Sequence, residues 1–129
     1  MIVVDSAAVV DALTAFPGSE GLRAELADED LHAPTLLDFE VTSALRGLTL
    51  GGHISPDRAR DALTDFDVLA IQRWPSAAPL RLRALNLRDN LSAYDAAYVV
   101  LAEALRCPVL TRDSRLARSG GHDVEIRVR

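Results

Sequence analysis

Cysteine and long apolar segments are both scarce in this sequence of 129 residues. The single cysteine, Cys107, cannot form an internal disulfide and has no second thiol for a metal site, so we expect a reducing, cytoplasmic compartment. No apolar run approaches the roughly 20 residues that a membrane-spanning helix needs. The first residues carry no basic region and reach Asp5 almost at once, which is unlike a secretory signal peptide. We therefore expect no membrane association.

Lysine is absent, and all 14 basic residues are arginine. With 19 acidic residues the formal net charge is −5, which argues against a general nucleic-acid-binding protein. The charge is uneven along the chain, because ten arginines lie in residues 68–129 whereas eleven acidic residues lie in residues 20–67. If some of the acids converge on a divalent cation, the arginine-rich half could contact phosphate groups.

The length and composition indicate one globular domain over residues 1–129, with 49% hydrophobic and 26% charged residues. Short apolar runs, typical of buried parallel strands, alternate with helical patterns, and this alternation predicts an α/β fold with a parallel sheet covered on both faces. Tyr94 and Tyr98 are expected in the core or at an interface, and Arg115 and Arg118 in an irregular turn. The expected strands are 1–4, 30–34, 68–71, 108–111 and 124–128, and the expected helices are 7–15, from 19 onward, 34–51, from 55 onward, 76–87 and 93–106.

Four acidic residues from distant segments are expected at one edge of this sheet. Asp5 and Asp113 each follow a predicted strand, and Glu40 lies in the first two turns of the helix after the second strand. Asp95 opens another helix, three residues after the capping residue Ser92. Taken singly, each acid has a structural explanation as a cap, a solvated helix residue or a turn residue. Their joint placement outside the carboxyl ends of the strands favours a shared site.

The chemistry of such a site is that of a hard divalent cation. Clustered carboxylates repel one another unless a cation is bound between them, and carboxylate oxygens suit Mg²⁺ or Mn²⁺. A metal of this kind supports hydrolysis of a phosphodiester bond. The hydroxyls of Ser6, Ser92 and Thr111 flank the acids and can orient them. Arg112 is the main candidate for a phosphate contact, and Arg115 and Arg118 are weaker candidates. No Ser–His–Asp arrangement, metal-like histidine spacing or Gly-rich phosphate loop competes with this interpretation.

Four segments, in this order, span almost the whole chain: Val3–Ser6, Pro34–Val41, Leu91–Tyr98 and Leu110–Leu116. Each is weakly specific alone, but together they are specific. On these segments the sequence resembles the PIN-domain ribonucleases of the VapC toxin type, which occur in bacterial toxin–antitoxin pairs.

The resemblance implies a three-layer α/β/α sandwich with a central, mainly parallel sheet of four to five strands. It also implies a Mg²⁺- or Mn²⁺-dependent endoribonuclease whose catalytic acids are Asp5, Glu40, Asp95 and Asp113 and whose conserved hydroxyl is that of Thr111. We take Asp5, Asp95 and Asp113 as the metal ligands. The implied partners are substrate RNA, a cognate antitoxin protein and a second copy of the chain in a homodimer.

Three alternatives compete with this function. Receiver-like and haloacid-dehalogenase-like domains also cluster acids at strand ends, but they rely on a lysine to meet the phosphoryl group, and this sequence has none. A PIN-like domain that only binds RNA or a protein partner is the second alternative; the intact acids argue against it. The third is cleavage of DNA, because no residue here reports on recognition of the RNA 2′-hydroxyl.

Overall fold

The computed structural model describes all of residues 1–129. Five strands form one fully parallel sheet in the order β3-β2-β1-β4-β5. The strands are β1 (Ile2–Val4), β2 (Leu31–Pro34), β3 (Ile71–Trp74), β4 (Val109–Thr111) and β5 (Ile126–Val128). The helices are α1 (Ser6–Thr14), α2 (Leu22–Asp28), α3 (Leu36–Leu50), α4 (Pro56–Val68), α5 (Ala78–Asn86), α6 (Ala93–Leu105) and α7 (Ser114–Ala117).

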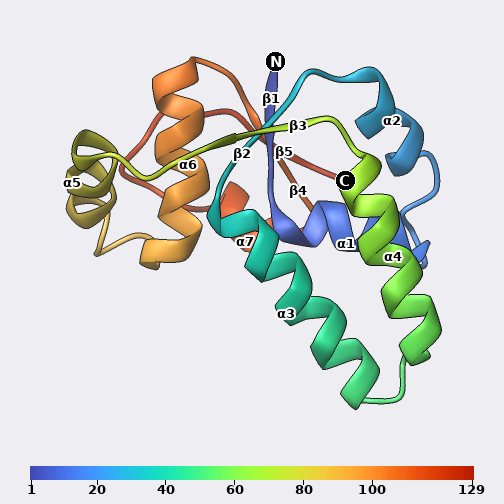
Figure 1. Ribbon diagram of the computed structural model, residues 1–129. Coiled ribbons are helices and arrows are strands. Elements are labelled where there is room, and N and C mark those ends of the chain that lie inside the picture. The colour runs from blue at the N-terminus through green and yellow to red at the C-terminus, as the bar shows by residue number, and fades with distance from the viewer.

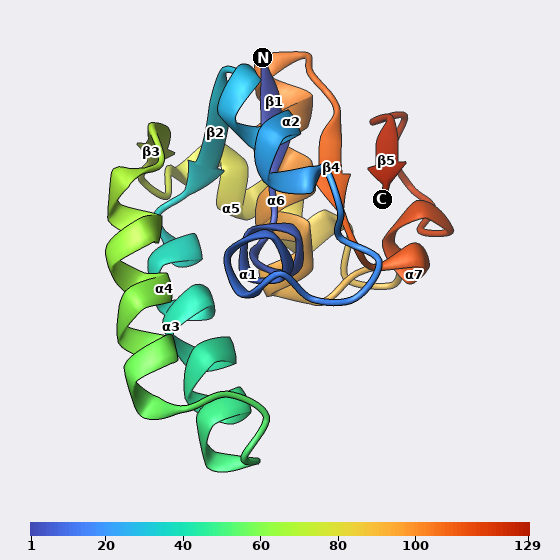
Figure 2. The ribbon, with the colours of Figure 1, turned by 90° about the vertical axis from the view of Figure 1, so that its right-hand side faces the viewer.

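Helices cover both faces of the sheet (Figure 1). On one face α6 packs against β1, β2 and β4, and α5 packs on α6. On the other face α1 contacts β4, α3 and α4. Figure 2 shows the sheet between these layers, with α1 in front of it and α6 behind. The predicted three-layer α/β/α arrangement with a parallel sheet is confirmed.

The core lies along the two central strands. Both β1 and β4 are buried at every position, as their continuous apolar runs predict. The middle of α6, Tyr98–Ala102, is buried against them, which confirms the expectation for Tyr98, whereas Tyr94 in the first turn is exposed. No helix combines the length and apolar character that crossing a bilayer requires.

Helices α3 and α4 form a hairpin that extends beyond the sheet (Figure 1). Gly52, which follows α3, has a φ of +73°, a left-handed conformation that glycine adopts readily. Ser55 then caps α4 by accepting a hydrogen bond from the backbone N–H of Arg58 at 3.0 Å, and Pro56 occupies the first helical position. Because the hairpin extends away from the sheet, only the first turns of α3 lie at the sheet.

Two local predictions were wrong. The strand expected at 68–71 is instead Ile71–Trp74, because α4 continues through the exposed Val68. Strand β3 lies at the edge of the sheet, so Gln72 and Arg73 are tolerated and the continuous apolar run of a central strand is missing. The segment after Asp113, expected as an irregular turn, forms the short helix α7.

Candidate active site

The four predicted acids lie in the segments that meet at the carboxyl edge of the sheet. Helices α1, α3 and α7 follow β1, β2 and β4, so they begin at this edge. Helix α6 runs in the opposite direction to the strands, and its C-terminus leads into the start of β4 at the other edge of the sheet. The N-terminus of α6 therefore also lies at the carboxyl edge (Figure 1). Asp5, Glu40, Asp95 and Asp113 thus come to one edge, as predicted from the topology.

Asp5 is the most buried of the four acids, at 8% exposed. It caps α1, because its Oδ1 accepts a hydrogen bond from the backbone N–H of Ala8 at 3.0 Å, and its Oδ2 accepts one from the hydroxyl of Thr111. Burial raises the pKa of Asp5 from 3.8 to about 6; the two hydrogen bonds oppose the rise, and the charges of Asp113 and Asp95 add to it. These three carboxylates therefore influence one another electrostatically.

Thr111 links Asp5 to Asp113. Its fully buried hydroxyl donates to Asp5 and accepts a hydrogen bond from the backbone N–H of Asp113 at 2.9 Å. The Asp113 carboxylate caps α7 and pairs with Arg115, with Nη2 to Oδ2 at 2.9 Å and Nε to Oδ1 at 3.2 Å. This Arg115 guanidinium holds the pKa of Asp113 below its usual range. Arg115 was predicted only as a weaker candidate for a phosphate contact, although its position two residues after Asp113 is a usable signal.

Glu40 is held by a side chain from another helix. The hydroxyl of Tyr98, on α6, donates a hydrogen bond to Glu40 Oε1, on α3. Burial and the Glu40 carboxylate raise the pKa of Tyr98, so the phenol remains a donor, while the hydroxyl of Ser6 lowers this pKa. Tyr98 was predicted only as a core or interface residue. Its position one helical turn after Asp95 is the signal that could have placed it at the site.

Asp95 is the most open of the acids. It lies in the exposed first turn of α6, where the capping residue Ser92 accepts a hydrogen bond from the backbone N–H of Asp95 at 3.2 Å. The capping prediction is confirmed. A carboxylate in the first turn of a helix is stabilised by the helix dipole, and Asp95 forms no ion pair with an arginine.

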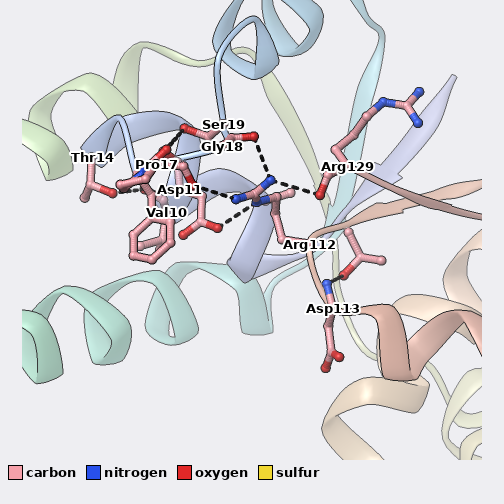
Figure 3. A network of polar contacts seen from close by, with 12 residues as sticks. Val10, Asp11, Thr14, Pro17, Gly18, Ser19, Arg112, Asp113 and Arg129 are labelled. Carbon is pink, nitrogen blue, oxygen red and sulfur yellow. Dashed lines mark hydrogen bonds and ion pairs between the residues drawn. The ribbon is translucent and has the colours of Figure 1, made fainter.

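Arg112 lies apart from the carboxylates, in a network of its own (Figure 3). Its guanidinium, on a side chain 15% exposed, pairs with Asp11 at 2.8 Å and donates to the backbone carbonyls of Pro17, Gly18 and Arg129 at 2.9–3.3 Å. Figure 3 shows this guanidinium and the Asp113 carboxylate on different sides of the β4 end. The structure therefore gives Arg112 a role in joining segments and does not bring it to the acids.

No group of three acidic, histidine or cysteine side chains in the chain is arranged to hold a metal ion. Both Asp5 oxygens accept hydrogen bonds, and both Asp113 oxygens are paired with Arg115. The donor set still suits a hard divalent cation, because it consists of carboxylates. A cation at this edge would compete with Arg115 for the Asp113 carboxylate.

A parallel five-stranded sheet between two helical layers, with acids from four segments at its carboxyl edge, defines a PIN-like α/β protein. The family profile described as PIN domain matches residues 2–121, so the chain belongs to the PIN-domain family. The chain is 46% identical to Ribonuclease VapC1 of Mycobacterium tuberculosis over 127 residues, which covers 98% of this chain and 96% of that protein. It is 38% identical to Ribonuclease VapC12 of the same organism over 128 residues, covering 99% and 98%.

Two solved structures share the fold. The crystal structure of PAE2754 from Pyrobaculum aerophilum aligns with a TM-score of 0.70 at 22% identity, over 98% of this chain and 83% of that one. The crystal structure of Mycobacterium tuberculosis VapC20, described as a Sarcin-Ricin loop cleaving toxin, aligns with a TM-score of 0.69 at 14% identity, over 97% and 99%. At these identities the structural likeness supports the fold.

Proposed function

We propose that the chain is a metal-dependent endoribonuclease and the toxin of a toxin–antitoxin pair. The observation that carries the proposal is the arrival of Asp5, Glu40, Asp95 and Asp113 at one sheet edge, each from a different segment. The relatives named Ribonuclease VapC, at 38–46% identity over nearly the full chain, support the same reaction class. Its substrate is RNA, and its place is the cytoplasm.

Asp5, Asp95 and Asp113 are the proposed ligands of a Mg²⁺ ion, with Mn²⁺ as the alternative. When bound, such an ion supplies an activated water and stabilises the leaving oxygen of the phosphodiester. Thr111 and the N-terminus of α1 hold Asp5 in place, and Ser92 fixes the turn that carries Asp95. Glu40 is outside the proposed ligand set; it keeps one oxygen bonded to Tyr98, and its other oxygen orients the attacking water.

The substrate phosphate needs a cationic contact near the acids. Arg112, the residue predicted for this contact, would have to give up Asp11 and three backbone carbonyls to make it. Arg115 is 80% exposed and already lies at the Asp113 carboxylate. We therefore propose that Arg115, in place of Arg112, contacts the substrate phosphate after its guanidinium has left the Asp113 carboxylate.

A non-catalytic PIN-like domain that binds RNA or a protein is the second candidate function. The observation that favours it is the pairing of Asp113 with Arg115, which leaves no group of three side chains arranged for a metal. Failure to bind Mn²⁺ in solution would support it. The buried, charge-coupled Asp5 favours the nuclease, because strongly perturbed carboxylates concentrate at functional sites.

The proposed protein partners are a cognate antitoxin and a second copy of the chain. An apolar groove of about 450 Å³, lined by Trp74, Leu80 and Leu85 among others, lies between α5, α6 and the end of β3. Exposed apolar surface of this kind supports contact with a protein. Light scattering of the purified chain, alone and with a co-expressed antitoxin, measures both assemblies.

The experiment that tests the function is cleavage of a mixed pool of structured RNAs. Wild type and Asp95→Asn are compared with Mg²⁺, with Mn²⁺ and with chelator, and matched single-stranded DNA is included. We expect discrete cuts in RNA that require both Asp95 and metal. Equal cutting by the variant would place the site elsewhere, and absence of both cutting and metal binding would support the non-catalytic alternative.

A further inference from the structure

Tyr98 joins three segments of the site. Its side chain is only 3% exposed, and its hydroxyl donates to Glu40 across the 58 residues that separate α6 from α3 in the sequence. The hydroxyl of Ser6, the first residue of α1, lowers the pKa of the same phenol, and the negative charge of Asp5 raises it. The phenol thus lies between the first turn of α1 and the second turns of α3 and α6.

Glu40 depends on this one contact. Tyr98 is the only side chain that donates a hydrogen bond to its carboxylate, and no arginine or histidine forms an ion pair with it. Asp5, by comparison, is held by Thr111 and a backbone N–H, and Asp113 by Arg115. Without the phenol, the half-buried glutamate side chain would regain its rotamer freedom and spend less time in any one orientation.

We propose that Tyr98 is a positioning residue of the nuclease site, whose hydroxyl fixes Glu40 so that the free carboxylate oxygen faces the edge where Asp5, Asp95 and Asp113 lie. This inference rests on the proposed function. Tyr98 touches neither substrate nor metal in this role and acts through Glu40. A tyrosine serves because its buried ring packs in the core while its hydroxyl reaches a polar group.

The test compares Tyr98→Phe with Tyr94→Phe in cleavage of the identified RNA. The two tyrosines lie one turn apart on α6, but Tyr94 is 67% exposed and makes no side-chain hydrogen bond, so it is a matched control. We expect Tyr98→Phe to lower kcat about 10- to 100-fold, the effect of losing a hydrogen bond to a charged group, with KM nearly unchanged. Tyr94→Phe should cleave at the wild-type rate. Mn²⁺ affinity should be unchanged in both variants.

A double-mutant comparison separates positioning from general stability. If Tyr98 acts through Glu40, Tyr98→Phe combined with Glu40→Gln should be no slower than Glu40→Gln alone. Independent, multiplying losses would overturn the inference, as would equal rates of Tyr98→Phe and wild type while Glu40→Gln is impaired. A wild-type rate for Glu40→Gln, or no cleavage by wild type at all, would instead overturn the proposed function and, with it, this inference.

Discussion

At the scale of single residues, Asp5 shows that the site is built at the expense of stability. An acid that only caps a helix would be solvated, with a pKa near or below its usual range. Asp5 is instead buried beside two other carboxylates, and burial raises its pKa to about 6. Carboxylates whose pKa is raised by burial in this way are typical of functional sites.

Replacing Asp5 by asparagine should stabilise the protein in chelator at pH 7.5. Because the folded state holds the Asp5 proton more tightly than the unfolded chain, the free energy of unfolding falls as pH rises from about 4 to about 6. The full shift corresponds to about 1–3 kcal/mol, which Asp5→Asn should regain. Thermal melts at pH 7.5 and at pH 4 measure this, and the gain should shrink toward pH 4. A variant that is less stable than wild type at both pH values would contradict the buried, charged state of Asp5.

Arg115 should compete with a cation for the Asp113 carboxylate. An exposed ion pair of this kind contributes up to about 1 kcal/mol, so Arg115→Gln should tighten Mn²⁺ binding about two- to fivefold at low salt. Calorimetric titration measures the affinity. Arg118→Gln is the control, because Arg118 also lowers the pKa of Asp113 by its charge yet makes no ion pair with it. Equal tightening in both variants would show a general charge effect and no competition.

At the scale of elements, three of the four acids of the site are positioned by the N-termini of helices. Asp5, Asp95 and Asp113 lie at the starts of α1, α6 and α7, where capping and dipole both favour a carboxylate. Capping signals are local, so the sequence predicted the starts of α1 and α6 and the edge at which they meet, whereas the start of α7 was expected as an irregular turn. The shifted strand β3 shows the limit: an edge strand is half-exposed, and its position depends on pairing with β2, which no local pattern reports.

Arg112 should stabilise the protein by joining β4, α1 and the end of β5. It ties the end of β4 to Asp11 in α1, to the turn that follows α1 and to the carbonyl of Arg129 after β5. Arg112→Gln should therefore lower the free energy of unfolding by about 1–3 kcal/mol, because a largely buried guanidinium leaves its partners unsatisfied.

Chemical denaturation measures this change, and hydrogen exchange should show faster opening of β5. The control is Arg60→Gln, whose pair with Asp57 is fully exposed and should change stability by less than about 1 kcal/mol. If Arg112→Gln were as stable as wild type and lost only RNA affinity, the structural role would be contradicted and Arg112 would instead contact the substrate phosphate.

At the scale of the whole molecule, the sequence predicted the acids and the hydroxyls of Thr111 and Ser92 beside Asp5 and Asp95, but it did not predict that Tyr98 holds Glu40 or that Arg115 holds Asp113. Alternating apolar runs and helices determine the topology, and the topology brings Asp5, Glu40, Asp95 and Asp113 to one edge. The contacts between Tyr98 and Glu40 and between Arg112 and Asp11 cross 58 and 101 residues, so they depend on side-chain geometry in the folded chain. Spacing along the chain can place Tyr98 near Asp95, but it cannot pair Tyr98 with Glu40 or Arg112 with Asp11.

Mg²⁺ should raise the melting temperature of the wild-type protein by several degrees at millimolar concentration. A ligand that binds only the folded state stabilises it by mass action. Asp95→Asn should lose most of this shift without losing its fold, since Asp95 is exposed. Ca²⁺ and NaCl at matched ionic strength control for screening. An equal shift in both proteins would mean that the cation binds elsewhere.

The central claim is that three carboxylates from α1, α6 and α7 hold one divalent cation. Anomalous diffraction from a crystal of the protein grown with Mn²⁺ tests it most directly. We expect a single strong anomalous peak between Asp5, Asp95 and Asp113, at about 2.0–2.3 Å from their oxygens, with Arg115 turned away from Asp113. A peak at another site, or none with Arg115 still paired to Asp113, would contradict the proposed metal site.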